Sequence, residues 1–361
     1  MASGNEFEWR RETISAGLAE RKLDAMLVSF SANLRYLTGF TGSNGNLLVL
    51  PDAAILFTDP RYQIQARQEV TCEVKIAKGP LVLDIAAAIG KRRLRRIGYE
   101  PARTTCDWFD SLNGRLPLKA SLEAVPGWIE ELRAIKSAQE REWIRRSVET
   151  NSRAFEQTVK RVRAGMKEQD LAAELEYRMR RLGAEKPAFE TIVAGGIRSA
   201  LPHAQPTQAR LQPGGLVLVD MGAIQDGYCS DMTRVLFLGT PAAKVKRTYR
   251  AVLEAQLAAL DAVRAGVTTA HVDRQARGVL KSYGLDRAFV HSTGHGLGLE
   301  IHEPPRIGRR DKGRLEAGMA VTVEPGVYLE GFGGIRIEDT VVVTNSGCEI
   351  LTQTSKELRS V

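Results

Sequence analysis

Cysteine is scarce in this sequence and never clustered. The 361 residues include only four cysteines, and no two of them form a CxxC pair. That pattern excludes a zinc ribbon and argues against a disulfide framework. We expect most of these side chains to be small buried hydrophobes. They are Cys72, Cys106, Cys229 and Cys348.

Long apolar runs are absent as well. Charged residues recur every few positions between Met1 and Lys22, so no signal-peptide apolar stretch lies there. No uncharged apolar run approaches the length needed to span a membrane. The sequence therefore predicts a cytoplasmic protein with no membrane partner.

Aromatic residues make up only 6% of the chain, although the net charge is +8 and the sequence pI is near 9.4. A basic balance of this kind is compatible with an acidic partner. The densest basic runs, Lys91–Arg96 and Arg178–Arg181, are short and carry no aromatics that could stack on bases. We interpret them as solvated helix faces and expect no nucleic-acid partner.

The length and the order of predicted elements indicate two domains of unequal size. Residues 1–127 alternate between helix and strand patterns, which predicts an amino-terminal α/β domain. Residues 128–138 read as a helical linker, and residues 139–361 as the second domain. Inside that domain Val162–Gly165 and Val263–Gly266 are identical, and each follows a long helical stretch. A duplicated half-domain is the better interpretation of this repeat.

The second domain contains a predicted hairpin with an acid on each strand. The apolar strand Leu216–Asp220 ends in an acid, Gln225–Gly227 supplies turn residues, and Tyr228–Leu238 returns with Asp231. Counted outward from the turn, the two acids fall opposite one another within about one register step, on a shared face. Two buried like charges repel, which favours a divalent cation between them. For one hairpin alone, neutralisation by arginine or a backbone amide is an equal alternative.

A second hairpin repeats this arrangement. Glu324 and Glu338 flank the glycine-rich turn Glu330–Gly334 and are nearly symmetric about Gly331, so we expect them to face one another. Pro325 indicates that the first strand ends or distorts there. Two acid pairs in duplicated positions favour a metal site over isolated ion pairs.

Three of the five histidines cluster shortly before the second hairpin, at His291, His295 and His302. Glycines on both sides of His295 would let a backbone come close to a crowded centre. Four carboxylates and one imidazole form a hard, oxygen-rich donor set, whose charge suits two divalent ions better than one. The set favours manganese, with cobalt, zinc or iron as alternatives, over copper or a thiolate-bound zinc.

Together these segments resemble the pita-bread metallopeptidases, the family of methionine aminopeptidase, aminopeptidase P and prolidase. The resemblance is strong over residues 190–345, and its extension into the amino-terminal domain is typical of the Xaa-Pro branch. The matching stretches are Leu201–His203, Val219–Gly222, Ser230–Arg234, Thr293–Gly298, Ile301–Glu303, Val323–Gly326 and Gly334–Asp339, with Tyr36–Gly45 and Phe57–Tyr62 in the first domain.

The resemblance implies an α+β protein, in which a small α/β amino-terminal domain precedes a pita-bread catalytic domain made of a duplicated αβ half. It implies that Asp231 and Glu338 bridge two metal ions and that Asp220 is a bidentate ligand of one of them. His295 and Glu324 would complete the two coordination spheres.

The same resemblance implies residues that line or support the substrate pocket. They are His203, His291, His302, Tyr328 and Arg336. Ala204 and Thr207 stand where the family usually has glycine and serine, and these departures bear on the shape of the pocket.

The activity implied is hydrolysis of the Xaa-Pro bond at the amino terminus of short peptides with proline in second position. A hydroxide bridging two metal ions would attack, Glu324 would carry a proton to the leaving nitrogen, and His291 or His302 would hydrogen-bond the oxyanion. We favour an Xaa-Pro aminopeptidase from the look of Thr38–Gly45 and keep the Xaa-Pro dipeptidase, prolidase, as the alternative. A homodimer is expected because relatives are commonly dimers.

Other classes stay open as rivals. Non-catalytic pita-bread scaffold proteins and metal-free creatinase-like enzymes share the fold but typically lose metal ligands, whereas all five are present here. A covalent hydrolase is disfavoured, because Ser230 lies in no G-x-S-x-G elbow and Cys106 has no cysteine-protease signature around it.

Overall fold

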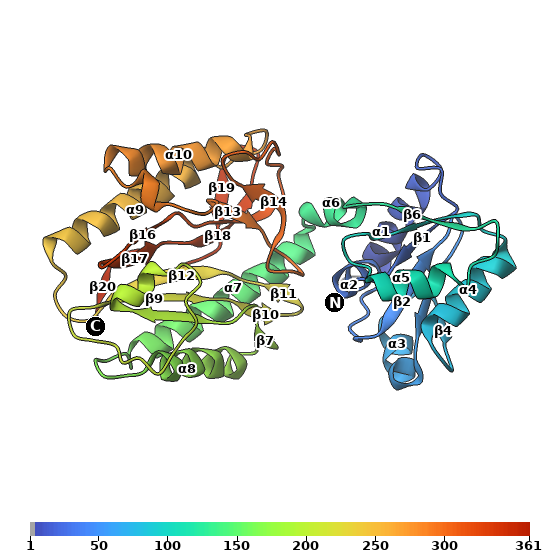
Figure 1. Ribbon diagram of the computed structural model, residues 1–361, viewed down its shortest axis with the longest axis horizontal. Coiled ribbons are helices and arrows are strands. Elements are labelled where there is room, and N and C mark those ends of the chain that lie inside the picture. Colours follow the sequence, from blue (N-terminus) through green and yellow to red (C-terminus); the bar gives the residue numbers. More distant parts are fainter. Residues whose placement is uncertain (1–3) are drawn as a thin grey trace. The chain divides into compact units, whose positions relative to one another are not determined.

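The computed structural model describes residues 4–361, and the contacts within the chain separate into two units at Arg133 (Figure 1). The carboxy-terminal unit is Ala134–Val361. Helix α6 (Trp128–Ala134) occupies the boundary, within the stretch expected as a linker. Each unit has its own sheet system and its own hydrophobic core.

The amino-terminal unit is built on a six-stranded mixed sheet in the order β4-β3-β2-β1-β5-β6. Its strands are β1 (Ala25–Val28), β2 (Gly45–Val49), β3 (Ala54–Thr58), β4 (Glu73–Ile76), β5 (Arg96–Tyr99) and β6 (Ser121–Ala124). Its helices are α1 (Gly4–Gly17), α2 (Ser31–Thr38), α3 (Gln63–Glu69), α4 (Leu81–Arg92) and α5 (Cys106–Asn113). Apolar residues of β1, β2, β3, β5 and α4 meet in one core, which confirms the expected α/β class.

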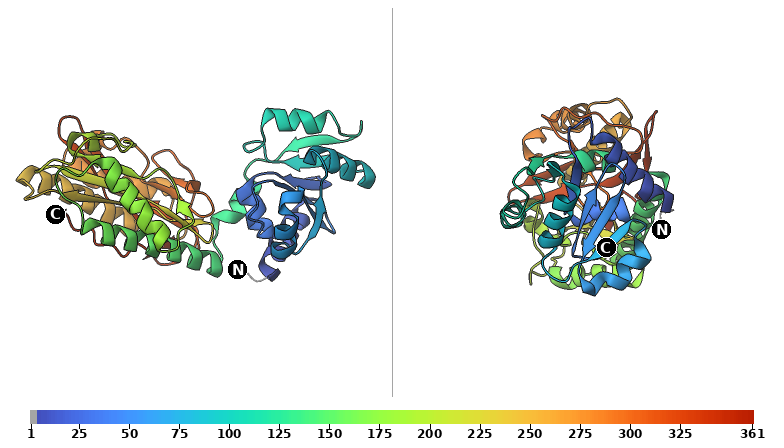
Figure 2. Two further views of the ribbon diagram at one scale, coloured as in Figure 1. Left: turned by 90° about the horizontal axis from the view of Figure 1, so that it is seen from below. Right: turned by 90° about the vertical axis from the view of Figure 1, so that its right-hand side faces the viewer.

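The carboxy-terminal unit consists of two similar halves. The first half contains α7 (Ala138–Val159), α8 (Glu168–Arg181), β7 (Lys186–Pro187), β8 (Ile192–Gly195), β9 (Leu216–Met221), β10 (Ala223–Gln225), β11 (Tyr228–Cys229) and β12 (Met232–Phe237). The second half contains α9 (Ala243–Ala262), α10 (Thr269–Ser282), β13 (Gly294–Gly296), β14 (Glu303–Ile307), β15 (Ala320–Val323), β16 (Gly326–Leu329), β17 (Gly333–Arg336), β18 (Asp339–Val343) and β19 (Cys348–Ile350), and β20 (Arg359–Ser360) follows beside β12. The views of this unit place α7 and α8 on one side of its strands and α9 and α10 on the other (Figures 1 and 2).

Equivalent hydrogen bonds in the two halves show that the short sequence repeat marks a real duplication. The N–H of Gly165 donates to Leu211 O, and the N–H of Gly266 donates to Leu315 O. Both glycines have a φ of 83°, which a side chain would strain. The arginine before each leucine donates to the carbonyl of the corresponding glycine. The duplicated half-domain predicted from the repeat is therefore present.

The two halves bury largely apolar strands between their helices. All residues of β9 and β12 are buried, and so are those of β15 and β18. Strands covered on both faces are expected to be apolar throughout. Acids at the ends of these strands are therefore unusual, because no solvent is present there to stabilise their charge.

The cysteines differ from the expectation that most would be buried. Cys229 is buried, Cys72 and Cys348 are half-buried, and Cys106 is exposed; all four are free thiols. Partial burial raises the pKa of Cys72 and of Cys348, which keeps both protonated at neutral pH. Among residues 4–361, no helix combines the length and the apolar character that crossing a membrane requires.

Candidate metal centre

Asp220 and Asp231 reach the centre from two neighbouring strands. Asp220 lies in β9, and Asp231 directly precedes β12. The ladder places Asp220 opposite Thr233, and the connecting turn has positive φ at Asp226 and Gly227. Asp231 is therefore two residues from the position opposite Asp220, which corrects the expected offset of about one step. Because side chains alternate with a period of two, this offset keeps both acids on one face.

Glu324 and Glu338 lie between two ladders of the second half. The β15–β18 ladder, in which Val323 is opposite Asp339, and the β16–β17 ladder share one register, and that register places Glu324 opposite Glu338. Regular strand pairing is interrupted at Pro325, as its missing N–H predicts. The expected facing pair is thus present in the backbone.

His295 approaches the acids from β13. Its Nε2 lies 3.6 Å from Asp231 Oδ2 and 3.5 Å from Glu324 Oε1. Its Nδ1 lies 2.9 Å from the Gly296 carbonyl, an arrangement in which Nδ1–H donates and Nε2 is left with its lone pair. A Cβ on Gly294 or Gly296 would lie 2.0 Å or 2.2 Å from a backbone oxygen. Glycine is required on both sides for this close approach.

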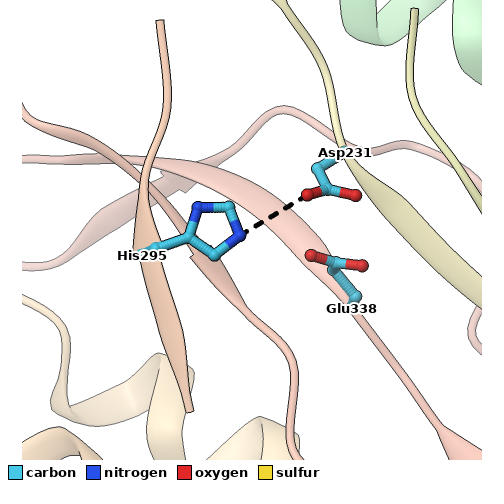
Figure 3. A group of neighbouring side chains, drawn as sticks. All are labelled: Asp231, His295 and Glu338. Atoms are coloured by element: carbon cyan, nitrogen blue, oxygen red, sulfur yellow. Dashed lines mark ion pairs between the residues drawn. The ribbon is translucent and has the colours of Figure 1, made fainter. Parts of the chain in front are cut away.

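Asp231, His295 and Glu338 converge into one compact group, with ligand atoms within 4.8 Å of one another (Figure 3). Burial raises the pKa of Asp231 and of Glu338 well above the ordinary values, and the neighbouring carboxylates raise both further. Burial also raises the pKa of Glu324 to about 7. Carboxyl groups that resist ionising together mark a position where a cation is needed.

The orphaned atoms of the cluster fit a metal. Asp220 Oδ1 and Glu338 Oε1 are buried and have no hydrogen-bond partner in the described chain, although buried acceptors normally have one. Within residues 4–361, Arg336 is the only arginine or lysine that forms an ion pair with the four acids, through Nη2 at 2.5 Å from Asp220 Oδ2. One guanidinium leaves most of the negative charge of four carboxylates unbalanced. The donor set, rich in carboxylate oxygen, suits hard or borderline divalent cations.

Arg336 also forms hydrogen bonds with residues around the carboxylate cluster. Its Nη1 donates to Tyr328 Oη at 2.5 Å and its Nε donates to Thr233 Oγ1 at 3.0 Å. Thr233 in turn donates its hydroxyl to Glu338 Oε2 at 2.7 Å. Thr233 was not among the predicted site residues. Its position opposite Asp220 in the hairpin was the feature that could have identified it as a site residue.

His291 has no free N–H in this arrangement. Its Nδ1 lies 2.8 Å from the Ser292 carbonyl and its Nε2 lies 2.9 Å from Tyr328 Oη. The carbonyl can only accept, so the proton is on Nδ1 and Nε2 accepts from the tyrosine. Burial lowers the pKa of His291 to about 3 and keeps the ring neutral. Burial likewise raises the pKa of Tyr328 to about 12, so its hydroxyl stays a donor.

Helix α10 holds the segment that carries His291. Arg277 donates to the carbonyls of Phe289 and His291 at 2.8 Å and 2.5 Å. Asp273, which is fully buried, accepts from Arg277 Nε at 2.7 Å and from Thr293 Oγ1 at 2.8 Å. This pair was not predicted, although opposite charges at i and i+4 on a helix are visible in the sequence.

A cavity of about 760 Å³ opens over the carboxylates. Its lining includes all five predicted ligands together with His203, His291, His302 and Arg336. Tyr328 is absent from the lining and contacts two of its residues, His291 and Arg336. His203 and His302 are exposed, and the His302 ring lies 4.4 Å from that of His295. Partial removal of the ring from solvent and the nearby histidines lower the pKa of His302, so its ring is neutral at pH 7.

Two exposed charged residues of the lining were not predicted. They are Glu190 and Arg306. Arg306 follows His302 by four residues and lies opposite His295 in the β13–β14 ladder. Its closeness in the sequence to the predicted segment of His295 and His302 was the feature that could have identified Arg306 as a site residue.

Comparison with known proteins agrees with this geometry. Residues 142–345 match Metallopeptidase family M24, and residues 10–135 match the Creatinase/Prolidase N-terminal domain. An Xaa-Pro dipeptidase of Pyrococcus furiosus is 34% identical over 97% of this chain and 99% of its own length.

Solved structures superpose over almost the whole chain. An Xaa-Pro dipeptidase from Bacillus anthracis has a TM-score of 0.96 and 36% identity, covering 98% of this chain and 100% of its own. An X-Pro aminopeptidase from Thermotoga maritima has a TM-score of 0.90 and 39% identity, covering 95% and 99%. The pita-bread fold and the enzyme class, a metallo-exopeptidase, are confirmed by these matches. A cavity floored by four carboxylates and a histidine, on a duplicated scaffold that matches over its length, places this chain in metallopeptidase family M24.

Proposed function

We propose that this protein is an Xaa-Pro dipeptidase that uses two divalent metal ions. The observation that carries the proposal is the buried group of Asp231, His295 and Glu338 at the floor of the cavity, with Asp220 and Glu324 beside it. Asp231, Glu338, Asp220, His295 and Glu324 would together hold the two ions. Manganese suits these oxygen-rich donors, with cobalt or zinc as substitutes.

When bound, the ions would polarise the scissile carbonyl and bring the pKa of a water molecule towards roughly 7. The protein groups have their own tasks. The Glu324 carboxylate accepts the proton of the attacking water as the water oxygen bonds to the carbonyl carbon. It then returns that proton to the proline nitrogen as the C–N bond breaks. A raised pKa, about 7 without metal, suits a group that must accept and release a proton near neutrality.

The histidines of the cavity have two roles: some bind the substrate, and one supports other side chains of the site. His302 and His203 are exposed on the cavity wall, so an imidazole N–H from either can donate to the carbonyl oxygen as negative charge develops there. Both nitrogens of His291 are engaged, so we assign it to fixing Tyr328 and through it Arg336.

Arg306 favours the dipeptidase over the aminopeptidase expected first. Arg306 lines the cavity, is exposed, and has no ion-pair or side-chain hydrogen-bond partner among the described residues. A dipeptide carries a free carboxylate on its proline, and a guanidinium matches a carboxylate in a bidentate geometry. The relatives from Pyrococcus furiosus and Bacillus anthracis, both named Xaa-Pro dipeptidases, support the same choice.

An Xaa-Pro aminopeptidase is the second candidate, favoured by the Thermotoga maritima structure, which matches over 95% of this chain. The two functions separate in one assay of metal-loaded protein, with Met-Pro and Met-Pro-Ala as substrates and manganese added. The proposal requires faster release of methionine from the dipeptide. Faster cleavage of the tripeptide would select the aminopeptidase, and cleavage of neither would refute both.

The expected homodimer forms part of the proposal and is tested by the solution mass of the protein. A mass near twice 39.7 kDa supports it, and a mass near 39.7 kDa contradicts it.

A further inference from the structure

The cavity over the carboxylates presents two exposed side chains of opposite charge, Glu190 and Arg306. Neither forms an ion pair or a side-chain hydrogen bond with any residue from 4 to 361. Arg336, the other arginine of the lining, is buried and committed to Asp220. Glu190 is thus an acid of the cavity that the metal cluster and its supporting residues do not use.

The two charges belong to different walls of the cavity. Glu190 precedes β8, the edge strand of one sheet, in which Ile192 lies opposite Asp220. Arg306 lies in β14, the edge strand of another sheet, opposite His295. A substrate that reaches both walls therefore meets a cation at one and an anion at the other.

A dipeptide likewise has its carboxylate at one end and its first residue at the other. With its carboxylate at Arg306, as the proposed function has it, its first residue is directed towards the wall of Glu190. That wall also carries Phe189 and Ile192, which line the cavity beside Glu190. Apolar groups next to an exposed acid suit a side chain with an apolar stem and a cationic end, because the stem can pack while the charge stays hydrated.

We propose that Glu190 is a specificity-determining residue that favours Xaa-Pro dipeptides whose first residue is lysine or arginine. This inference rests on the proposed function, since it uses the orientation set by Arg306. An exposed ion pair of this kind contributes little, so the preference is expected to be about fivefold and to weaken as salt is added.

The test compares kcat/KM of the manganese-loaded protein for Lys-Pro and Met-Pro, which have side chains of similar length and differ in charge. Glu-Pro and Gln-Pro form the opposite pair. In the wild type we expect Lys-Pro to exceed Met-Pro by about fivefold at low salt. In Glu190→Gln that ratio should fall to about one, with kcat/KM for Met-Pro unchanged, and in Glu190→Lys the preference should move to Glu-Pro.

Glu316→Gln is the matched control, because Glu316 is exposed and does not line this cavity. It removes the same charge and should leave the Lys-Pro to Met-Pro ratio as it is. Equal melting temperatures and manganese contents of the variants show that folding and metal loading are intact.

The possible failures are distinct. Hydrolysis of Met-Pro with no advantage for Lys-Pro overturns the inference and leaves the dipeptidase standing. An equal loss for every dipeptide in Glu190→Gln also overturns it, because the acid then contacts the amino group that all of them share. If no dipeptide is hydrolysed, the proposed function fails and the inference fails with it.

Discussion

Thr233 donates its hydroxyl to Glu338 Oε2 at 2.7 Å, whereas the other oxygen of that carboxylate, Oε1, has no hydrogen-bond partner among the described residues. The same hydroxyl accepts from Arg336 Nε at 3.0 Å. Thr233 is fully buried, and it lies opposite Asp220 in the hairpin. One hydroxyl therefore orients two groups around the cluster without being a ligand itself.

Replacing that hydroxyl should weaken metal binding. Thr233→Val keeps the shape of the side chain, leaves Glu338 Oε2 and Arg336 Nε without this partner, and is expected to lower manganese affinity by about 10- to 100-fold. Isothermal titration of the metal-free protein with manganese measures the change. Thr233→Ser restores a hydroxyl and should recover most of the affinity; an unchanged affinity in the valine variant would remove Thr233 from the site.

Metal should stabilise the fold. A cation that binds only the native cluster adds about 2.7 kcal/mol to the free energy of unfolding at a concentration 100 times its Kd. We expect the melting temperature of chelator-treated protein to rise by several degrees when manganese is added, and to fall again with excess chelator. Asp231→Asn should lose most of that rise. An equal rise in wild type and variant would mean that the ions bind elsewhere.

Without metal, stability should decrease as pH rises. Glu324 has its pKa raised to about 7, and Asp231 and Glu338 are raised well above their ordinary values. Unfolded carboxyls lose their protons near pH 4, so between about 4 and 7 the native state binds more protons than the unfolded one. The free energy of unfolding then falls with rising pH through this window.

Urea titrations of chelator-treated protein at several pH values measure this slope. Glu324→Gln cannot ionise at that position, so the variant should show a shallower slope than the wild type. The same protons must leave before metal binds, so manganese affinity should rise over this pH range. Parallel slopes in the two proteins would contradict the assignment of the raised pKa to Glu324.

Breaking the Asp273–Arg277 pair should lower kcat more than it lowers metal content. Arg277→Met removes the donors that hold the carbonyls of Phe289 and His291, and a small misplacement of a positioned group can cost about 100-fold in rate. We expect kcat to fall by about 10- to 100-fold with manganese content retained. Arg274→Met changes an exposed arginine on the same helix and should have no effect. Equal activity of the two variants would contradict the positioning role of Arg277.

Arg306 should act on substrate affinity. Arg306→Gln removes the guanidinium proposed to hold the dipeptide carboxylate, and KM for Met-Pro is expected to rise by about tenfold with little change in kcat, since an uncharged hydrogen bond is weaker. The amide Met-Pro-NH₂ lacks the carboxylate and should lose much less. Arg310→Met, an exposed arginine outside the lining, is the control. A rise in KM that is equal for Met-Pro and its amide would contradict this role.

Much of the site could be predicted from the sequence because its determinants are local. An acid at the end of an apolar strand, a turn that sets the register, and glycines beside a histidine are each visible within about ten residues. The facing of Glu324 and Glu338 followed from the symmetry of their turn, and the matching ladders on both sides have that register. The repeat of Val162–Gly165 likewise indicated the duplicated halves.

Contacts between segments far apart in the chain were decided by the tertiary structure alone. The distance between His295 and Asp231, the pairing of Arg336 with Asp220 and the engagement of both His291 nitrogens each join different elements. Local patterns constrain which face a side chain occupies, but not which distant side chain meets it there. The sequence therefore determined the donor set and its chemical character, whereas only the folded chain decided that four acids share one cavity with a single balancing arginine, because charge balance depends on three-dimensional distance.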